Sequence, residues 1–187
     1  MSSLLEEIAA EVRRCTKCPL ARSRANAVPG DGPESARLMF VGEAPGGQED
    51  REGSPFVGPA GRFLNELLEQ AGIRREDVFI TNIVKCRPPG NRDPMPSEIE
   101  ACRDHLVGQI AAIGPAAVCT LGSPALRTLV DPKLSIGRVH GTSQPRGGIL
   151  YVPLYHPAAA IHNPSLRRTI IEDMAKVAPM LHQAQRT

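Results

Sequence analysis

The stretch Leu38-Met-Phe-Val-Gly-Glu-Ala-Pro-Gly-Gly-Gln-Glu-Asp50 passes from an apolar run into a loop rich in glycine and carboxylates. The apolar run predicts a buried strand over Leu38 to Gly42, and the polar residues predict a loop over Glu43 to Gly58. Apolar side chains then recur at helical spacing from Phe63 to Ala71, and Gly72 is suited to end that helix. Strand, loop and helix in this order are one unit of an α/β fold with a parallel sheet.

Similar units follow along the chain. Further strands are predicted over Val78 to Val84, Ala116 to Leu121 and Ile149 to Tyr155. Helix starts are predicted at the capping boxes Ser3-x-x-Glu6 and Ser97-x-x-Glu100, at Ser123-Pro124 and at Asn163-Pro164, with Pro179 kinking or fraying the last helix. We therefore expect one domain over residues 1–187, a three-layer α/β/α fold with a central four-stranded, mainly parallel sheet.

Composition excludes several classes of protein. A net charge of +2 gives no strong global attraction for polyanions, although 18 of the 22 basic residues are Arg, which fits phosphate locally. Six Tyr and Phe with no Trp do not make a broad aromatic platform for single-stranded nucleic acid. Glu6, Glu7 and Glu11 interrupt the apolar region that an export signal needs, and five cysteines are too few for a secreted disulfide scaffold. We expect a cytoplasmic, intracellular protein.

Four of the cysteines form a candidate metal site. Cys15-x-x-Cys18 follows the first helix, and Cys86 and Cys102 flank a proline-rich loop far away in the sequence. A thioredoxin-like redox pair is disfavoured because it lies between a strand and a helix start, whereas this pair follows a helix. Buried thiols without a metal suit Cys119 well and Cys102 tolerably. Four thiolates from two segments suit a zinc ion or a [4Fe-4S] cluster equally on spacing alone.

The ends of the predicted strands carry polar side chains and one aromatic ring. Asn82 is placed inside a strand, where Asn is disfavoured, and its amide offers both a donor and an acceptor. His156 follows the last strand, Phe56 lies in a turn, and Glu43 and Glu49 lie in the glycine-rich loop. Each feature alone also fits a structural role, as a cap, a core plug or a solvated acid. In parallel sheets ligands bind at the carboxyl ends of strands, so together these residues predict a pocket for a planar heterocycle.

The combined motifs resemble the iron-sulfur, or family 4, uracil-DNA glycosylases. The resemblance rests on five segments in the family's order together with all four cysteines, over about Cys15 to Asn163. These segments are Gly42-Glu-Ala-Pro-Gly46 with Gln48-Glu-Asp50, Pro55-Phe-Val-Gly58, Thr81-Asn-Ile-Val-Lys-Cys86, Asn91-Arg-Asp-Pro94 and His156-Pro-Ala-Ala. The resemblance implies a [4Fe-4S] cluster held by Cys15, Cys18, Cys86 and Cys102, with residues 1–20 and 85–103 supplying the ligands.

The implied reaction is hydrolysis of the N-glycosidic bond of deoxyuridine in single- or double-stranded DNA. By resemblance, Phe56 stacks on the flipped uracil, Asn82 pairs with its O4 and N3–H edge, and His156 stabilises charge at O2. By resemblance, Gly42, Glu43 and Ala44 complete the uracil pocket. The resemblance also implies that the segment Pro157 to Arg168, with Arg167 and Arg168, presses against the minor groove and backbone as an intercalating loop, and that the segment with Arg87 and Arg92 binds phosphate. The protein is expected to act as a monomer on nucleoid DNA.

The candidates for the water-activating group follow from a departure from the family 1 enzymes. In family 1 enzymes the corresponding motif is Gly-Gln-Asp-Pro-Tyr, whose Asp falls on Ala44 and whose Tyr falls on Gly46. Glu43 is therefore the first candidate, followed by Glu49 and Asp50, with crowding of the thymine methyl as an alternative role for Glu49. The other function classes that fit are a non-enzymatic four-cysteine nucleic-acid-binding module and an electron carrier.

Overall fold

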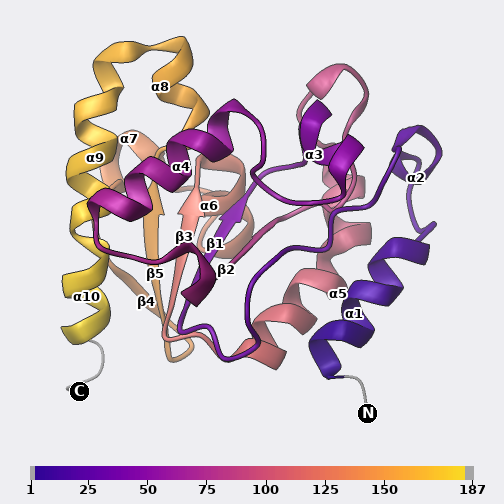
Figure 1. Cartoon of the computed structure of the whole chain (residues 1–187), viewed down its shortest axis with the longest axis horizontal. Coiled ribbons are helices and arrows are strands. Elements are labelled where there is room, and N and C mark those ends of the chain that lie inside the picture. The colour runs from indigo at the N-terminus through magenta and orange to yellow at the C-terminus, as the bar shows by residue number, and fades with distance from the viewer. Residues whose placement is uncertain (1–2, 184–187) are drawn as a thin grey trace.

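The computed structural model describes residues 3–183 and contains one mixed sheet between two layers of helices (Figure 1). The five strands lie in the order β2-β1-β3-β5-β4. The parallel strands are β1 (Leu38–Gly42), β2 (Val78–Asn82), β3 (Ala117–Leu121) and β5 (Ile149–Leu154). The predicted three-layer, mainly parallel fold is confirmed.

One strand of the sheet is not among the predicted strands. β4 (Gln144–Arg146) pairs antiparallel with β5 at the edge of the sheet, so the sheet has five strands rather than four. The strand is three residues long and contains Pro145, which leaves no apolar alternation to detect. Gly147 and Gly148, both at positive φ, form the turn into β5.

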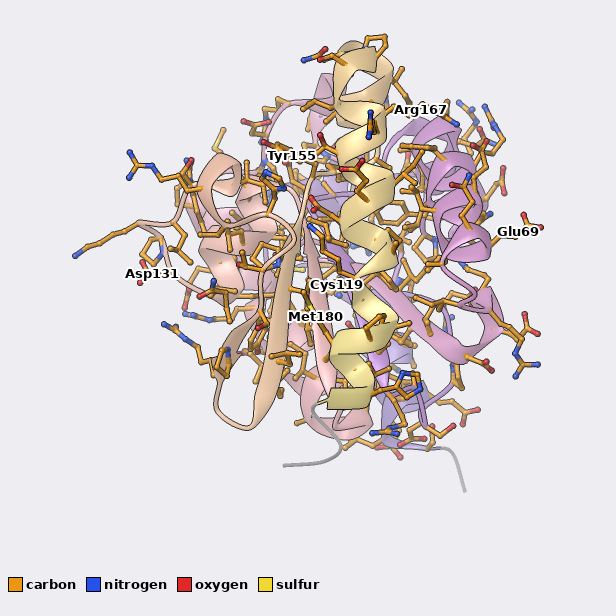
Figure 2. The ribbon with its side chains drawn as sticks, turned by 90° about the vertical axis from the view of Figure 1, so that its left-hand side faces the viewer. Glu69, Cys119, Asp131, Tyr155, Arg167 and Met180 are labelled. Atoms are coloured by element: carbon orange, nitrogen blue, oxygen red, sulfur yellow. The ribbon has the colours of Figure 1, made fainter. Side chains whose placement is uncertain are left out.

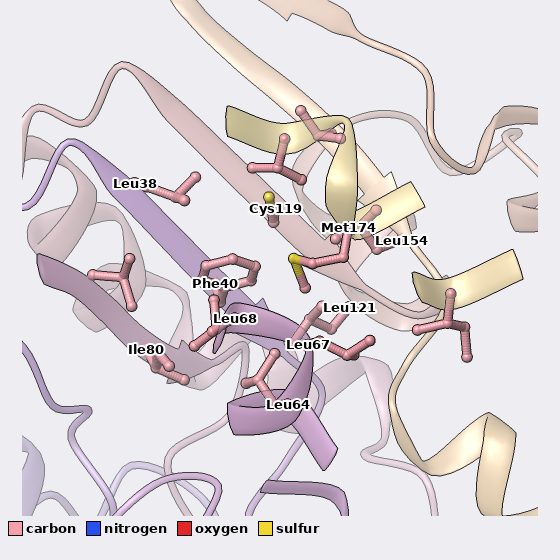
Figure 3. Packing of buried hydrophobic residues seen from close by; sticks show 14 of the residues in the cluster. Leu38, Phe40, Leu64, Leu67, Leu68, Ile80, Cys119, Leu121, Leu154 and Met174 are labelled. Atoms are coloured by element: carbon pink, nitrogen blue, oxygen red, sulfur yellow. The ribbon is translucent and has the colours of Figure 1, made fainter. Parts of the chain in front are cut away.

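The two faces of the sheet are covered by different helices because strand side chains alternate. Leu38 and Phe40 pack beneath helices α4, α9 and α10, together with the side chains in Figure 3. Met39 and Val41 point to the opposite face, beneath α1, α5 and α6. The bounds of these helices are α1 (Leu4–Arg14), α4 (Pro59–Gln70), α5 (Pro96–Ile113), α6 (Ser123–Leu129), α9 (Arg167–Ala175) and α10 (Val177–Gln183).

Short elements connect these parts of the fold. They are α2 (Leu20–Ser23), α3 (Gly47–Glu52), η1 (Arg75–Asp77), η2 (Pro89–Asn91), α7 (Ile136–Val139), α8 (Ala158–His162) and η3 (Pro164–Leu166). The residues of α3 lie in the predicted loop Glu43 to Gly58, which is wrong at this point; α3 has no apolar face, so its sequence carries no helical spacing of apolar residues. No helix among the described residues is long and apolar enough to cross a membrane.

Of the predicted helix starts, the one at Ser3 is confirmed, and those at Ser97 and Ser123 are wrong in detail. The capping box of α1 is confirmed, because Ser3 Oγ accepts from Glu6 N and Glu6 Oε2 accepts from Ser3 N. In contrast, α5 begins at Pro96, and Glu98 rather than Glu100 accepts from the N-cap backbone of Met95. Helix α6 is preceded by Gly122, so Ser123 is its first residue rather than its cap.

The ends of two other elements also differ from expectation. β2 ends at Asn82 instead of Val84, although Ile83 N and Val84 N still donate to Gly42 O and Glu43 O. The last predicted helix is divided into η3, α9 and α10. The break between α9 and α10 follows Ala175, four residues before Pro179, which agrees with the clash of a proline ring with the carbonyl of residue i−4.

Candidate active site at the carboxyl edge of the sheet

The carboxyl ends of β1, β2 and β5 open into a cleft of about 710 Å³. In Figure 1 this edge lies at the top, beside α3 and α8. The cleft brings together most of the predicted catalytic and uracil-binding residues, plus one of the predicted arginines. These lining residues are Glu43, Ala44, Glu49, Phe56, Asn82, Arg92 and His156. Gly42, the last residue of β1, is buried next to the cleft.

Asn82 and Phe56 lie against each other over Gly42. The strand register pairs Gly42 with Asn82. A Cβ on Gly42 would lie 2.5 Å from Asn82 Oδ1 and 2.8 Å from Phe56 Cζ, so no larger residue fits. Asn82 Oδ1 is buried and makes no hydrogen bond with the described part of the chain. An unpaired buried acceptor costs about 1–3 kcal/mol, so the Oδ1 of this cleft-lining amide is suited to accept a hydrogen bond from a molecule bound in the cleft.

The Phe56 backbone is held in an unusual conformation with φ +52°. Glu49 Oε1 accepts from Val57 N at 3.0 Å and Gly58 N at 2.7 Å, which fixes the two residues after the ring. Gly61 approaches Phe56 so closely that a Cβ there would lie 1.8 Å from the Phe56 carbonyl oxygen. The ring therefore occupies one preset position.

His156 stacks beside Phe56, with ring centroids 5.6 Å apart. Its Nδ1 accepts a hydrogen bond from Ala158 N at 3.1 Å, so the ring proton is on Nε2. Burial lowers the pKa of His156 to about 4, opposed by the charge of Glu49. The imidazole is consequently a neutral N–H donor at physiological pH.

The three candidate carboxylates have different surroundings. Burial raises the pKa of Glu43, and the nearby charge of Asp93 raises it further. Glu49 Oε1 accepts hydrogen bonds from Val57 N and Gly58 N, directly after Phe56. Asp50 is buried and accepts from Ala25 N and Asn26 N with Oδ1, which gives it a structural partner instead of a place on the cleft.

The four predicted DNA-contacting arginines divide into two groups. Arg92 lines the cleft and forms a two-pronged ion pair with the buried Glu98, at 2.7 and 2.8 Å. Arg87 Nε donates to Asn91 Oδ1 at 2.7 Å. On the other side of the molecule, Arg167 lies at the start of α9 (Figure 2), with its guanidinium 4.4 Å from the centre of the Phe63 ring. Arg168 Nε donates to Glu172 at 2.7 Å.

Several residues of the cleft were not predicted as site residues. Asp93 affects Glu43, and Asn91 stands at φ +55° beside the cleft. Ile161 and His162 of α8 also line it, and Ile161 is 52% exposed, which is unusual for its type. Both residues lie in the segment Pro157 to Arg168, which the resemblance implies as an intercalating loop, but the exposure of Ile161 becomes visible only in the folded chain.

The four candidate ligand cysteines gather beside α1, α2 and α5. Cys86 and Cys102 are buried in one cluster with Ile8 and Val12, and Cys18 packs against it. Burial raises the pKa of the Cys102 thiol to about 11, and the charges of Cys86 and Cys15 raise it as well. The pKa of the Cys86 thiol is raised by burial and by the charges of Cys18 and Cys15. The four thiols therefore lie close enough to influence one another's pKa values.

Two N–H groups already point at the sulfurs. Arg24 Nη1 donates to Cys86 Sγ at 3.0 Å, and Lys85 N donates to Cys102 Sγ at 3.3 Å. Within residues 3–183, no three His, Cys, Asp or Glu side chains converge closely enough to hold a single metal ion. The fifth cysteine, Cys119, is buried in the sheet core as predicted (Figure 3).

The chain matches known proteins over almost its whole length. The family model described as "Uracil DNA glycosylase superfamily" matches residues 29–176. A type-4 uracil-DNA glycosylase of Saccharolobus solfataricus is 50% identical over 186 residues, covering 95% of this chain and 86% of that protein. Type-4 uracil-DNA glycosylases of Archaeoglobus fulgidus and Thermotoga maritima are 42% and 48% identical, covering 98% and 92% of this chain and 96% and 92% of theirs. The chain therefore belongs to the uracil-DNA glycosylase superfamily and, within it, to the type-4 family.

Proposed function

We propose that this protein is a uracil-DNA glycosylase that hydrolyses the N-glycosidic bond of deoxyuridine and leaves an abasic site in DNA. The observation that carries the proposal is the buried, unpaired Oδ1 of Asn82 beside the Phe56 ring. The names of the type-4 relatives agree with this activity.

Base recognition follows from the Asn82 amide. Oδ1 accepts from N3–H of uracil, and Nδ2 donates to O4, while the Phe56 ring stacks on the base. Cytosine presents an amine in place of O4 and an acceptor in place of N3–H, so both hydrogen bonds are lost. Mispairing of a buried polar group costs about 1–3 kcal/mol, which supports discrimination between the two bases.

Departure of the base is assisted by His156. As the bond to deoxyribose breaks, its electron pair moves onto the uracil ring and negative charge develops at O2. The neutral His156 Nε2–H donates to that oxygen, since Nδ1 is already engaged with Ala158 N. A preset donor of this kind stabilises the leaving anion without solvent reorganisation.

Water attack is assigned to Glu43. Its carboxylate lines the cleft and is half-buried, which suits a group that orients water and balances the cationic sugar. Glu49 acts indirectly, because its Oε1 holds the backbone after Phe56. Its position also places a carboxylate beside Gly46 and Gly58, where it limits room for the methyl group of thymine.

DNA is bound at the lip of the cleft. The exposed side chain of Ile161 is suited to occupy the gap that a flipped nucleotide leaves, since apolar wedges of this kind open base steps. Arg87 and Arg92 contact phosphate on one side, and Arg167 and Arg168 on the other. The substrate is uracil in single- or double-stranded DNA of the nucleoid in the cytoplasm. We expect a monomer to be sufficient because one chain supplies the whole cleft.

Cys15, Cys18, Cys86 and Cys102 would hold a [4Fe-4S] cluster. Cys86 and Cys102 lie in one buried cluster with Cys18 packed against it, and the N–H groups of Arg24 and Lys85 that donate to Cys86 and Cys102 suit sulfurs that carry negative charge. When bound, the cluster would brace the loop of Arg87 and Arg92 against the N-terminal helices.

The test is excision from an oligonucleotide carrying one uracil, followed by alkali to cleave abasic sites. Strand breaks at the uracil are expected with the wild-type protein, and none with a matched cytosine oligonucleotide. Intact strands with folded, cluster-loaded protein would contradict the proposal and favour the non-enzymatic binding module. Visible absorption of the same sample reports whether iron-sulfur or zinc is bound.

Replacing Glu43 tests its role. Glu43→Gln keeps the shape but removes the charge, so we expect single-turnover excision to fall about 10²-fold or more. In the wild type, the rate should fall as pH drops through the raised pKa of Glu43, because the carboxylate must be ionised. That acid limb should be absent from Glu43→Gln. Equal rates for both proteins at neutral pH would rule out the assignment.

A further inference from the structure

Lys85 is almost completely buried, with 1% of its surface exposed. Its ammonium donates to Thr81 Oγ1 at 2.6 Å, to Asn82 O at 2.9 Å and to Gln109 Oε1 at 2.6 Å. These three acceptors use all three N–H bonds of the ammonium. Burying a charge requires such complete pairing, because an unpaired ammonium in the interior is strongly destabilising.

The need for this ammonium arises from the neighbouring chain segment. Asp31 and Ile80 exchange both backbone hydrogen bonds, at 2.9 and 2.8 Å, and form an isolated antiparallel bridge beside β2. In an antiparallel ladder the next such pair lies two residues away in each chain, which would join residue 29 to Asn82. Residue 29 is Pro29, which has no N–H to donate to the Asn82 carbonyl.

The Lys85 side chain fills this gap in the ladder. Its Nζ reaches the Asn82 carbonyl in place of the missing backbone donor. The Pro29 carbonyl in turn accepts from Thr81 Oγ1 at 2.9 Å and Gln109 Nε2 at 2.7 Å. These contacts form a closed network that connects β2, α5 and the segment at Pro29.

We propose that Lys85 is a positioning residue for base recognition: its side chain supplies the hydrogen bond that Pro29 cannot give and thereby fixes the peptide from which the Asn82 amide reads the base. This inference rests on the proposed function. The side chain has no place on the cleft and does not contact the base, so its effect is transmitted through the backbone of Asn82.

The test compares Lys85→Met with Lys133→Met, whose lysine is exposed in the loop before α7. Lys85→Met keeps the backbone N–H that reaches Cys102 Sγ, so it removes only the side-chain bonds. We expect single-turnover uracil excision to fall about 10- to 100-fold, inhibition by free uracil to weaken, and affinity for uracil-free DNA to change less than about twofold. Lys133→Met should match the wild type in all three measurements.

A rescue experiment separates positioning from general damage. In the Lys85→Met background, Pro29→Ala introduces a backbone N–H at the position that the register of the Asp31–Ile80 bridge would pair with Asn82. We expect the double variant to recover at least about fivefold in excision and in free-uracil inhibition over Lys85→Met alone. Visible absorption establishes that each variant carries the proposed cluster, and thermal unfolding establishes that it is folded.

The outcomes are distinct. Wild-type protein that does not excise uracil would refute the proposed function. Active wild type with unchanged Lys85→Met would refute the role of Lys85 only, as would a double variant no better than Lys85→Met. If Lys85→Met does not fold, Gln109→Leu removes one acceptor of the network while keeping the charge. Weaker free-uracil inhibition in that variant supports the inference, and unchanged inhibition overturns it.

Discussion

At the scale of the residue, the neutral state of His156 has a measurable effect on stability. Its pKa in the folded protein is about 4, while an unfolded chain has a histidine pKa of ~6.5. Between these values the unfolded chain binds a proton that the folded protein does not. Stability is therefore expected to fall as the pH drops from about 6.5 to about 4, by up to about 3 kcal/mol from this group.

The measurement is urea unfolding of the wild type and His156→Gln at pH 7 and pH 4.5. The Gln side chain does not titrate and retains an N–H donor, so its loss of stability over this range should be smaller than that of the wild type. An equal loss in both proteins would show that His156 is not desolvated in the folded state.

At the scale of the element, the loop after α3 depends on its contact with α4. A Cβ on Gly61 would lie 1.8 Å from Phe56 O, a backbone atom that cannot move away without displacing the ring. Gly61→Ala is expected to destabilise the fold by about 3 kcal/mol or more and to weaken inhibition by free uracil. Denaturant unfolding and uracil inhibition check the two effects.

Gly137→Ala is the matched control within a helix. Nothing lies closer than 3.7 Å to a Cβ at Gly137 in α7, and Ala is favoured over Gly in helices. Its stability should equal or slightly exceed that of the wild type. If Gly61→Ala were equally harmless, the close packing between α4 and the Phe56 loop would not hold in solution.

At the scale of the whole molecule, Arg24 joins the N-terminal helices to the loop after β2. Nη2 donates to Arg13 O at 3.1 Å, near the end of α1, and Nη1 donates to Cys86 Sγ. Partners of metal ligands typically affect metal affinity by about 10- to 100-fold. If the proposed [4Fe-4S] cluster is bound, we expect Arg24→Gln to lose its visible absorption in the presence of a chelator at least about tenfold faster than the wild type.

Arg138→Gln, on the exposed helix α7, provides the control and should lose absorption at the wild-type rate. Identical loss from Arg24→Gln and Arg138→Gln would show that the Arg24 contact does not support the cysteine site.

Local patterns predicted much of the architecture. The apolar runs at Leu38 and Ala117 identified core strands, and the Ser3 capping box identified the start of α1, because these signals depend on neighbours in sequence. The same approach placed Asn82 and His156 at strand ends and Phe56 in the turn after the glycine-rich loop, and parallel strands bring such ends to one edge. The cleft does contain all three.

The sequence by itself therefore determined the four parallel strands of the sheet, its main helices and most of the residues that meet at its carboxyl edge. Only the tertiary structure decided that β4 adds an edge strand to the sheet, that Asp50 pairs with Ala25 N and Asn26 N instead of lining the cleft, and that Lys85 replaces a donor missing at Pro29. The physical reason is that hydrogen-bond partners such as Gln109 and Pro29 are 80 residues apart in the chain and become neighbours only after folding.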